Sequence, residues 1–521
     1  FSSLSLFFPE SFPALISGSI YNALLIYVLS DLSIRILFRL SREHRWSRLI
    51  DLVILAPLLG TLSVQYVFLY DPIFIAVSTL IVALRRSQDI AATWVELQNH
   101  PARLFTFGFL LLLIGSAILL YLPLSLLDSP STFIDALFMA SSALCVTGLT
   151  THTVSEMYSS TGQWIILTLI QLGGLGIMAF YAVILMLFNR KFSQREQLTF
   201  QESVASQSSQ ETRQVLRSIF VFSFLVEAIG ALILFFLWRP SFPDWGERLY
   251  FAVFHAISAF CNAGISLFPN SLFDYADHAG VLLCFSILII AGGLGFPVMV
   301  DLFRKNRVRY RVQTQLAIGV SGILIVISTL LIFFIESGHT FAAFSLLDQW
   351  SLSLFHAVSS RTAGFHAIPI SWFHPASIFV IIIFMFIGAS PGSTGGGIKT
   401  TTVGVLVKSF WSTIRGESDT VLFERRIGSD AAYRALAIMV ISLACIIGFV
   451  FLLLYLEPLP FLDIVFEVVS AFGTVGYSLG KTAMFHPVSK LLLIILMIIG
   501  RLGPLSIAIA FTQKKSSRRH R

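Results

Sequence analysis

The chain has 521 residues, of which 56% are hydrophobic and 12% are charged, and its formal net charge is +7. A water-soluble globular protein could not cover so much apolar surface, and apolar runs recur along the whole length, so the composition predicts a multi-pass membrane protein. The four cysteines form no CxxC pair and have no metal-ligand spacing, so they indicate neither a disulfide framework nor a metal site.

The first hundred residues contain three apolar segments, at 12–38, 50–69 and 72–86. We expect residues 1–100 to form additional N-terminal hydrophobic helices, although the third segment is short for a membrane span. Nothing in these residues predicts a role for them.

Four short segments with a shared pattern follow, each too short to span a bilayer and each containing Phe, then Ser, then Gly. They read FMASSALCVTGLT (138–150), FHAISAFCNAGIS (254–266), FHAVSSRTAGFH (355–366) and FEVVSAFGTVGYS (466–478). Apolar runs precede and follow each segment, so the pattern predicts four tandem units of helix, pore loop and helix. The predicted units are 101–190, 191–303 with its preceding cytoplasmic loop, 304–410 with a Gly-rich run at 388–397, and 411–521 with a basic tail.

Lys and Arg cluster in six places beside the apolar runs: 35–48, 85–103, 190–217, 304–311, 399–426 and 514–521. Short basic loops between apolar spans are the ordinary signal of the cytoplasmic side, so we interpret the clusters as topology signals and not as a nucleic-acid surface. This orientation predicts a cytoplasmic C-terminus and four glycine loops that open on the external side.

The four loops suit a dehydrated cation. Non-helical backbone at membrane depth is tolerated only where it is buried or lines a watery path. A short helix that ends at such a loop directs its negative dipole end toward a cation, and loops with few charges offer backbone carbonyls as ligands. Glycine adopts positive φ and can aim a carbonyl inward. The candidate filter residues are Val146, Thr147, Gly148, Asn262, Ala263, Gly264, Thr362, Ala363, Gly364, Thr474, Val475 and Gly476.

Seven motifs carry a family resemblance over about residues 101–515: SSALCVTGLT, IQLGGLGIM, FHAISAFCNAGIS, SSRTAGF, GASPGSTGGGIKT, FGTVGYS and GRLGP. With them the chain resembles the membrane subunit of the Trk/Ktr/HKT potassium-transporter superfamily. The resemblance implies an all-α membrane protein in which four helix–pore loop–helix repeats surround one pore pseudo-fourfold. It implies potassium as the substrate, one filter glycine per repeat, and potassium coordination at Thr147, Asn262, Thr362 and Thr474.

The same resemblance implies a cell membrane location, a homodimer and a cytoplasmic nucleotide-binding regulatory subunit. A Ser at the first filter position accompanies sodium preference in some members, so Gly148 favours potassium. A sodium-conducting or poorly selective cation pathway on the same scaffold is the alternative, and coupling to sodium or protons stays open. We expect no covalently bound cofactor.

The run 388–397 interrupts a predicted membrane helix with Pro391 and five glycines, so the helix should break there. It fails as a phosphate-binding loop, because Ile398 separates Gly397 from Lys399 and no strand precedes it. By resemblance it is the intramembrane gating loop. The predicted gate residues are Gly392, Ser393, Thr394, Gly395, Gly396, Gly397, Lys399 and Arg501.

Arg501 lies inside the last apolar span, where an unpaired Arg would cost about 2.5–3.5 kcal/mol on insertion scales. We expect it to face the pore opposite the Gly-rich run, and the alternative is an Arg that only bonds neighbouring helices. For Asp135 and Asp463, helix capping and cation attraction are both open. His255 and His356 lack metal-spaced partners and nucleophiles, so packing explains them better and no enzyme is predicted.

Overall fold

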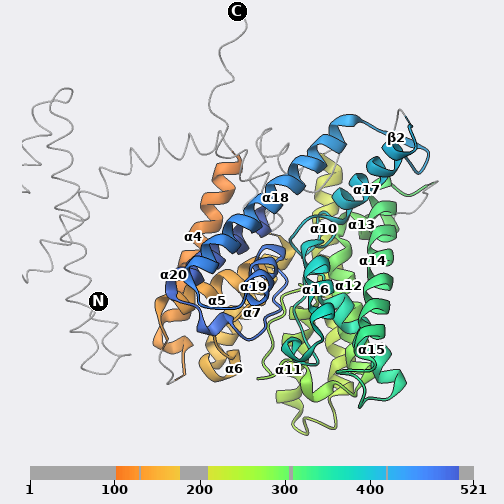
Figure 1. Cartoon of the computed structure of the whole chain (residues 1–521). Helices are drawn as coiled ribbons and strands as arrows, with labels where there is room; N and C mark the ends of the chain where they lie inside the picture. The colour runs from red at the N-terminus through yellow and green to blue at the C-terminus, as the bar shows by residue number, and fades with distance from the viewer. Residues whose placement is uncertain (1–100, 128–130, 177–208, 304–308, 418–419, 504–521) are drawn as a thin grey trace, which may run out of the picture. The chain divides into compact units, whose positions relative to one another are not determined.

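The computed structural model describes residues 101–127, 131–176, 209–303, 309–417 and 420–503. They belong to one compact unit, Pro101–Arg521, whereas the predicted N-terminal helices and the basic tail at 514–521 lie outside the described residues. Apart from one two-stranded hairpin, the regular structure of the described residues is helical, which confirms the mainly α-helical fold class (Figure 1).

One order of elements occurs four times in the described residues: a long helix, a short helix, a loop and another helix. The long helices are α4 (Pro101–Tyr121), α10 (Ser209–Leu237), α14 (Val312–Glu336) and α18 (Ser429–Leu456). The short helices are α5 (Phe133–Cys145), α11 (Trp245–Phe260), α15 (Leu346–Ser359) and α19 (Phe461–Gly473). The helices after the loops are α7 (Ser160–Leu175), α12 (Ala279–Leu294), α16 (Pro375–Phe386) and α20 (Pro487–Leu502). Each long helix forms one group with the short helix and the post-loop helix that follow it, and we number these helix groups first to fourth in chain order.

The remaining helices are α6 (Val154–Met157), α13 (Phe296–Leu302) and α17 (Thr400–Ile414). Short 3-10 turns are η1 (Pro123–Ser125), η2 (Phe273–Tyr275), η3 (Ile370–Trp372) and η4 (Thr482–Met484). The strands β1 (Thr420–Leu422) and β2 (Arg425–Ile427) pair antiparallel between α17 and α18, with Val421 opposite Arg426.

The groups pack on one another in a closed order. The helix after each loop lies against the short helix of the next group: α7 on α11, α12 on α15, α16 on α19, and α20 back on α5. The last contact joins the fourth helix group to the first, and Figure 1 shows α20, in blue, beside α5, in orange. The shared phenylalanines of the four segments are all fully buried: Phe138, Phe254, Phe355 and Phe466. The repeated Phe is therefore a core residue of the packed short helices.

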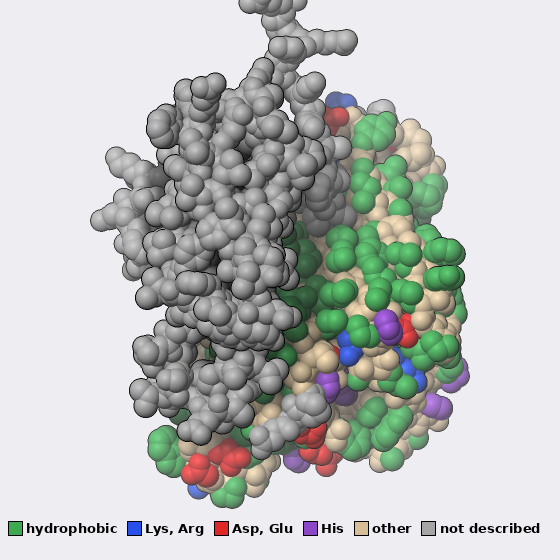
Figure 2. Space-filling model, turned by 90° about the vertical axis from the view of Figure 1, so that its left-hand side faces the viewer, with side chains coloured by type: hydrophobic (Ala, Val, Ile, Leu, Met, Phe, Trp, Pro, Cys, Tyr) green, Lys and Arg blue, Asp and Glu red, His purple; other side chains and the backbone are tan. Residues whose placement is uncertain are grey.

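Several helices are long and apolar enough to cross a membrane. Within the described residues these are Ile219–Leu237, Val312–Glu336 and Ser429–Leu456, and the pair α12–α13 also passes the test together although it bends by 94°. Large apolar side chains on α14 and α18 are exposed, as at Phe334 and Phe451. Figure 2 views the molecule from the left-hand side of Figure 1 and shows hydrophobic side chains over much of the described part of that face. Such apolar outer surfaces are typical of helices that face lipid.

Local hydrogen bonds start three of the short helices. Thr132 and Asp135 form a capping box at α5, while Asp244 and Ser345 accept N–H groups at the starts of α11 and α15. The capping hypothesis for Asp135 is confirmed. At α19 the N-cap is Pro460, which has no side-chain oxygen, and Asp463 lies 3.9 Å from the Lys481 ammonium instead. Asp463 is therefore not part of a capping box.

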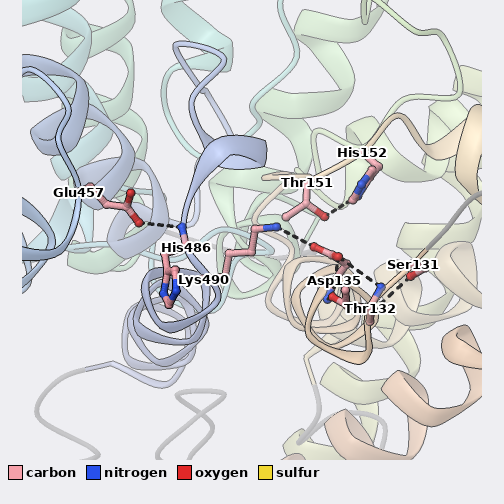
Figure 3. A network of polar contacts seen from close by, with 8 residues as sticks. All are labelled: Ser131, Thr132, Asp135, Thr151, His152, Glu457, His486 and Lys490. Atoms are coloured by element: carbon pink, nitrogen blue, oxygen red, sulfur yellow. Dashed lines mark hydrogen bonds and ion pairs between the residues drawn. The ribbon is translucent and has the colours of Figure 1, made fainter.

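A buried ion pair joins the fourth group to the first. Lys490 Nζ at the start of α20 donates to Asp135 Oδ1 over 2.8 Å, and Figure 3 shows the lysine reaching across to α5. The Lys490 and Asp135 side chains are only 11% and 7% exposed. Because Thr132 also donates to Asp135, the carboxylate is well satisfied and its charge is compensated.

Lys490→Met should lower the free energy of unfolding by about 3–5 kcal/mol, because it leaves the Asp135 carboxylate buried without a partner. The measurement is the thermal unfolding midpoint of the purified protein in detergent. Lys481→Met is the matched control. Lys481 is more exposed than Lys490 and lies farther from its partner, 3.9 Å from the Asp463 carboxylate, so this substitution should lower the free energy of unfolding by less than about 1 kcal/mol. Equal midpoints for the two variants would contradict a stabilising role of the buried pair.

Candidate functional site

The four loops meet, and each contributes one glycine to a ring. A Cβ added to Gly148 would lie 2.5 Å from the carbonyl oxygen of Ala263 in the second group. The same close approach to the next carbonyl recurs from Gly264 to Ala363, from Gly364 to Val475 and from Gly476 to Thr147. The fourth loop thus returns to the first. We call Gly148, Gly264, Gly364 and Gly476 the glycine ring, and none of its positions has room for a side chain.

Backbone conformation repeats around the glycine ring. All four glycines have positive φ, between 66° at Gly264 and 95° at Gly476. The residue two positions earlier also has positive φ in every loop: 56° at Val146, 59° at Asn262, 80° at Thr362 and 48° at Thr474. Non-glycine residues pay about 1–3 kcal/mol for such conformations, and β-branched residues rarely adopt them. This cost, present in all four loops, marks the ring as a functional candidate.

The shared serines hold the loops in shape. In the first and fourth loops, Ser142 Oγ and Ser470 Oγ accept hydrogen bonds from the backbone N–H of the ring glycine, over 3.0 and 3.1 Å. In the second and third, Ser258 and Ser359 donate to the carbonyl of the residue after the glycine, over 2.7 and 2.6 Å. A hydroxyl can donate or accept, so one residue type serves both arrangements.

A cavity of about 280 Å³ opens on one side of the glycine ring. Besides the glycines, its lining includes the residue two positions after each of them: Thr150, Ser266, His366 and Ser478. His255 bonds Ser266 and the Leu267 N–H from behind, so this histidine supports the wall in addition to packing. At this shared position the cavity wall therefore carries three hydroxyls and one imidazole.

Glu467, which the sequence did not single out, supports the same wall in the fourth group. Its carboxylate is fully buried and accepts hydrogen bonds from Ser478 Oγ at 2.5 Å and Thr482 Oγ1 at 2.8 Å. Glu467 and His255 both directly follow the shared Phe. In the second and fourth groups, this position of the short helix therefore bonds the loop residues that follow the ring glycine.

The Gly-rich run lies on the other side of the ring. Helix α16 ends at Phe386, and α17 begins again only at Thr400, as the predicted helix break requires. Gly395 and Gly396 lie so close to the hydroxyls of Thr362 and Thr474 that a Cβ would collide with them, and the Gly396 N–H donates to Thr474 Oγ1 over 3.0 Å. The run is therefore in direct contact with the third and fourth loops.

The second group also holds the Gly-rich run. The N–H groups of Ser390 and Thr394 donate to the carbonyls of Gly293 and Gly292 over 3.1 and 3.3 Å, and the Gly392 carbonyl accepts from Phe296 at 3.0 Å. Gly292 begins the motif Gly-Gly-Leu-Gly at 292–295 and lies against the Phe260 carbonyl, a close approach typical of small residues between membrane helices. The motif has a further role here, because it binds the Gly-rich run.

Arg501 bridges the first and third groups from α20. Its guanidinium donates to the carbonyl oxygens of Thr394, in the Gly-rich run, and of Gly173, at the end of α7. Lys399 Nζ donates to the Gly395 carbonyl over 2.7 Å. Arg501, Lys399 and the Gly-rich run therefore lie together, and these bonds fit both the pore-facing hypothesis and an arginine that only bonds neighbouring helices.

A family model described as a cation transport protein, TrkH, matches residues 113–519. The chain belongs to this family of cation transport proteins. It is 37% identical over 433 residues to the Ktr system potassium uptake protein B of Bacillus subtilis, covering 82% of this chain and 96% of that protein. It is 34% identical over 427 residues to the potassium/sodium uptake protein NtpJ of Enterococcus hirae, covering 81% and 94%.

The fold of this TrkH-family chain is also that of a solved structure. The crystal structure of the potassium transporter TrkH from Vibrio parahaemolyticus matches with a TM-score of 0.63 over 96% of this chain and 97% of that one, at 16% identity. The predicted family is therefore confirmed, and it is a family of transporters rather than enzymes. The long apolar helices of this chain are those expected of a multi-pass membrane protein.

Proposed function

We propose that the chain takes up potassium ions through the glycine ring, with four pseudo-fourfold pore repeats around one path. The observation that carries this proposal is the closed sequence of contacts from each ring glycine to the carbonyl of the next loop. Carbonyl oxygens replace the water of a dehydrated cation, and the carboxyl ends of α5, α11, α15 and α19 direct negative dipole ends toward it. In this proposal the potassium ion is coordinated by the four loops at Thr147, Asn262, Thr362 and Thr474.

The gate in this proposal is the Gly-rich run together with Lys399 and Arg501. The run fills the space under two loops, and the Arg501 side chain crosses from the fourth group to the first and third. A fixed positive charge and a backbone plug both oppose passage of a cation. Opening then requires the run to leave Thr362 and Thr474 and Arg501 to release at least one carbonyl.

Potassium is favoured over sodium because the first ring position is Gly148 and not Ser. Two similar proteins carry the names potassium uptake protein and potassium/sodium uptake protein, so a broader cation pathway is the second candidate. Homodimer formation and a nucleotide-binding cytoplasmic subunit are further parts of the proposal, on family grounds.

The experiment is rescue of potassium-uptake-deficient cells at low external potassium, with rubidium and sodium influx measured in parallel. Wild type should restore growth and prefer rubidium, and Gly148→Ser should shift the flux ratio toward sodium. Absence of rescue by protein that is inserted in the membrane and supplied with the cognate regulatory subunit would overturn potassium uptake. Equal rubidium and sodium flux in wild type would favour the second candidate.

His366 gives a separate prediction at the external mouth. Its imidazole lines the cavity beside the glycine ring, two residues after Gly364. His366→Lys should reduce uptake about tenfold or more by placing a permanent charge there, whereas His366→Ser, the residue of two other loops, should not. Equal rubidium influx in the two variants would contradict this assignment.

A further inference from the structure

Arg361 is a buried cation beside the glycine ring that the proposed function does not use. It follows the end of α15 and directly precedes Thr362, whose φ is 80°. The residue is only 8% exposed, and no carboxylate within the described chain forms an ion pair with it. A buried charge at membrane depth is costly and usually functional, so the groups that compensate this one require a physical explanation.

The guanidinium of Arg361 joins three separate parts of the third group. One terminal nitrogen donates to the Ser321 carbonyl at 3.4 Å, and the other donates to Ser321 Oγ and to the Gly388 carbonyl, both at 3.3 Å. Ser321 belongs to α14, and Gly388 is the first residue of the Gly-rich run. The side chain therefore ties the third loop of the ring to the long helix and to the start of the run.

A small cavity of about 20 Å³ lies beside this contact and is lined by Arg361, Asn262, Ser321 and Ala389, among others. Nε of Arg361 is the guanidinium nitrogen without a protein partner among the described atoms. A space of this size accommodates one water molecule. The positive charge of Arg361 is thus compensated by neutral oxygens only. This compensation depends on the number and direction of the N–H donors of the guanidinium.

The planar fork of arginine is what this geometry requires. Its acceptors lie on two different elements, α14 and the Gly-rich run, and only a guanidinium carries donors fixed in several directions. Lysine would keep the charge but could not hold both acceptors in the same way. Gly388 is itself tightly placed, since a Cβ there would collide with the Gly396 carbonyl.

We propose that Arg361 is a positioning residue that anchors the Gly388 end of the Gly-rich run to α14 and to the third loop. The inference rests on the proposed gating role of this run. It links the filter and the gate within one group through a single side chain.

The test is the reactivity of a cysteine placed in the run. In a Ser393→Cys background, a membrane-impermeant thiol reagent applied from the cytoplasmic side reports how often the run leaves its position. Arg361→Lys should react about tenfold faster than the background protein, since its fork is lost. Ser321→Ala should give a smaller increase in the same direction, and it carries the test if the lysine variant does not fold.

Ser328→Ala is the matched control, because Ser328 is a buried serine on the same helix that bonds only carbonyls of its own helix. It should leave the reaction rate unchanged. Rates for Arg361→Lys and Ser321→Ala equal to that of Ser328→Ala would overturn the anchoring role. Rubidium influx of the wild type is measured separately, so a failure of potassium uptake itself is distinguished from a failure of the anchor.

Discussion

Gly264→Ala should lower rubidium uptake about a hundredfold while leaving the amount of protein in the membrane unchanged. The φ of Gly264 is 66°, and its new Cβ would collide with the Ala363 carbonyl oxygen and lie 3.1 Å from the Gly364 Cα. Strain at positive φ and overpacking each cost about 1–3 kcal/mol, and each 1.4 kcal/mol is a factor of ten. Because the crowded Ala363 carbonyl oxygen is itself a proposed cation ligand, the penalty falls on conduction.

Gly319→Ala is the matched control for this substitution. Gly319 lies in α14 and no atom is within 4 Å of an added Cβ, so alanine should be tolerated there and uptake should equal that of wild type. Uptake is measured as initial rubidium influx, normalised to surface-labelled protein. If Gly264→Ala transports as well as Gly319→Ala, the ring does not line the ion path.

Arg501→Ala should raise basal rubidium leak about tenfold. The substitution removes two hydrogen bonds from a charged donor to Thr394 and Gly173, each of which contributes about 1.5–3 kcal/mol, and it removes the positive charge from the proposed path. Both changes favour displacement of the Gly-rich run. The measurement is passive rubidium entry into proteoliposomes without a regulatory subunit.

Arg415→Ala provides the comparison for Arg501. Arg415 is the C-cap residue that follows α17, is exposed, and lies over the Trp411 ring at 5.4 Å, so its loss should not change the leak. Arg501→Lys should leak at an intermediate rate, because it retains the charge but cannot bridge two carbonyls. A leak in Arg501→Ala no greater than that of Arg415→Ala would assign Arg501 a structural role only.

The local features of the site were predictable from the sequence. The Phe, Ser and Gly of each segment recur with nearly constant spacing, and each has a physical role in the structure. The Phe is buried, the Ser bonds the loop, and the Gly leaves room for the next carbonyl. Pro391 and its glycines likewise predicted the break between α16 and α17. Short-range patterns of this kind follow directly from residue chemistry.

Contacts between distant groups were not predictable in the same way. Nothing in the neighbourhood of Asp135 or Lys490 indicates that they pair across the whole set of groups, and Glu467 and Arg361 carry no local motif that reveals their partners. The positive φ at Val146, Thr362 and Thr474 was missed because β-branched residues disfavour it, so only tertiary contacts impose it.

The central claim is that the four loops form one cation-binding ring, and the most direct test is to locate the ion. Crystals of transport-competent protein grown with thallium should show anomalous scattering on the axis of the glycine ring, next to Thr147, Asn262, Thr362 and Thr474. Gly264→Ala crystals should lose that density. Thallium bound elsewhere, with no density at the ring, in protein that transports rubidium would contradict the account.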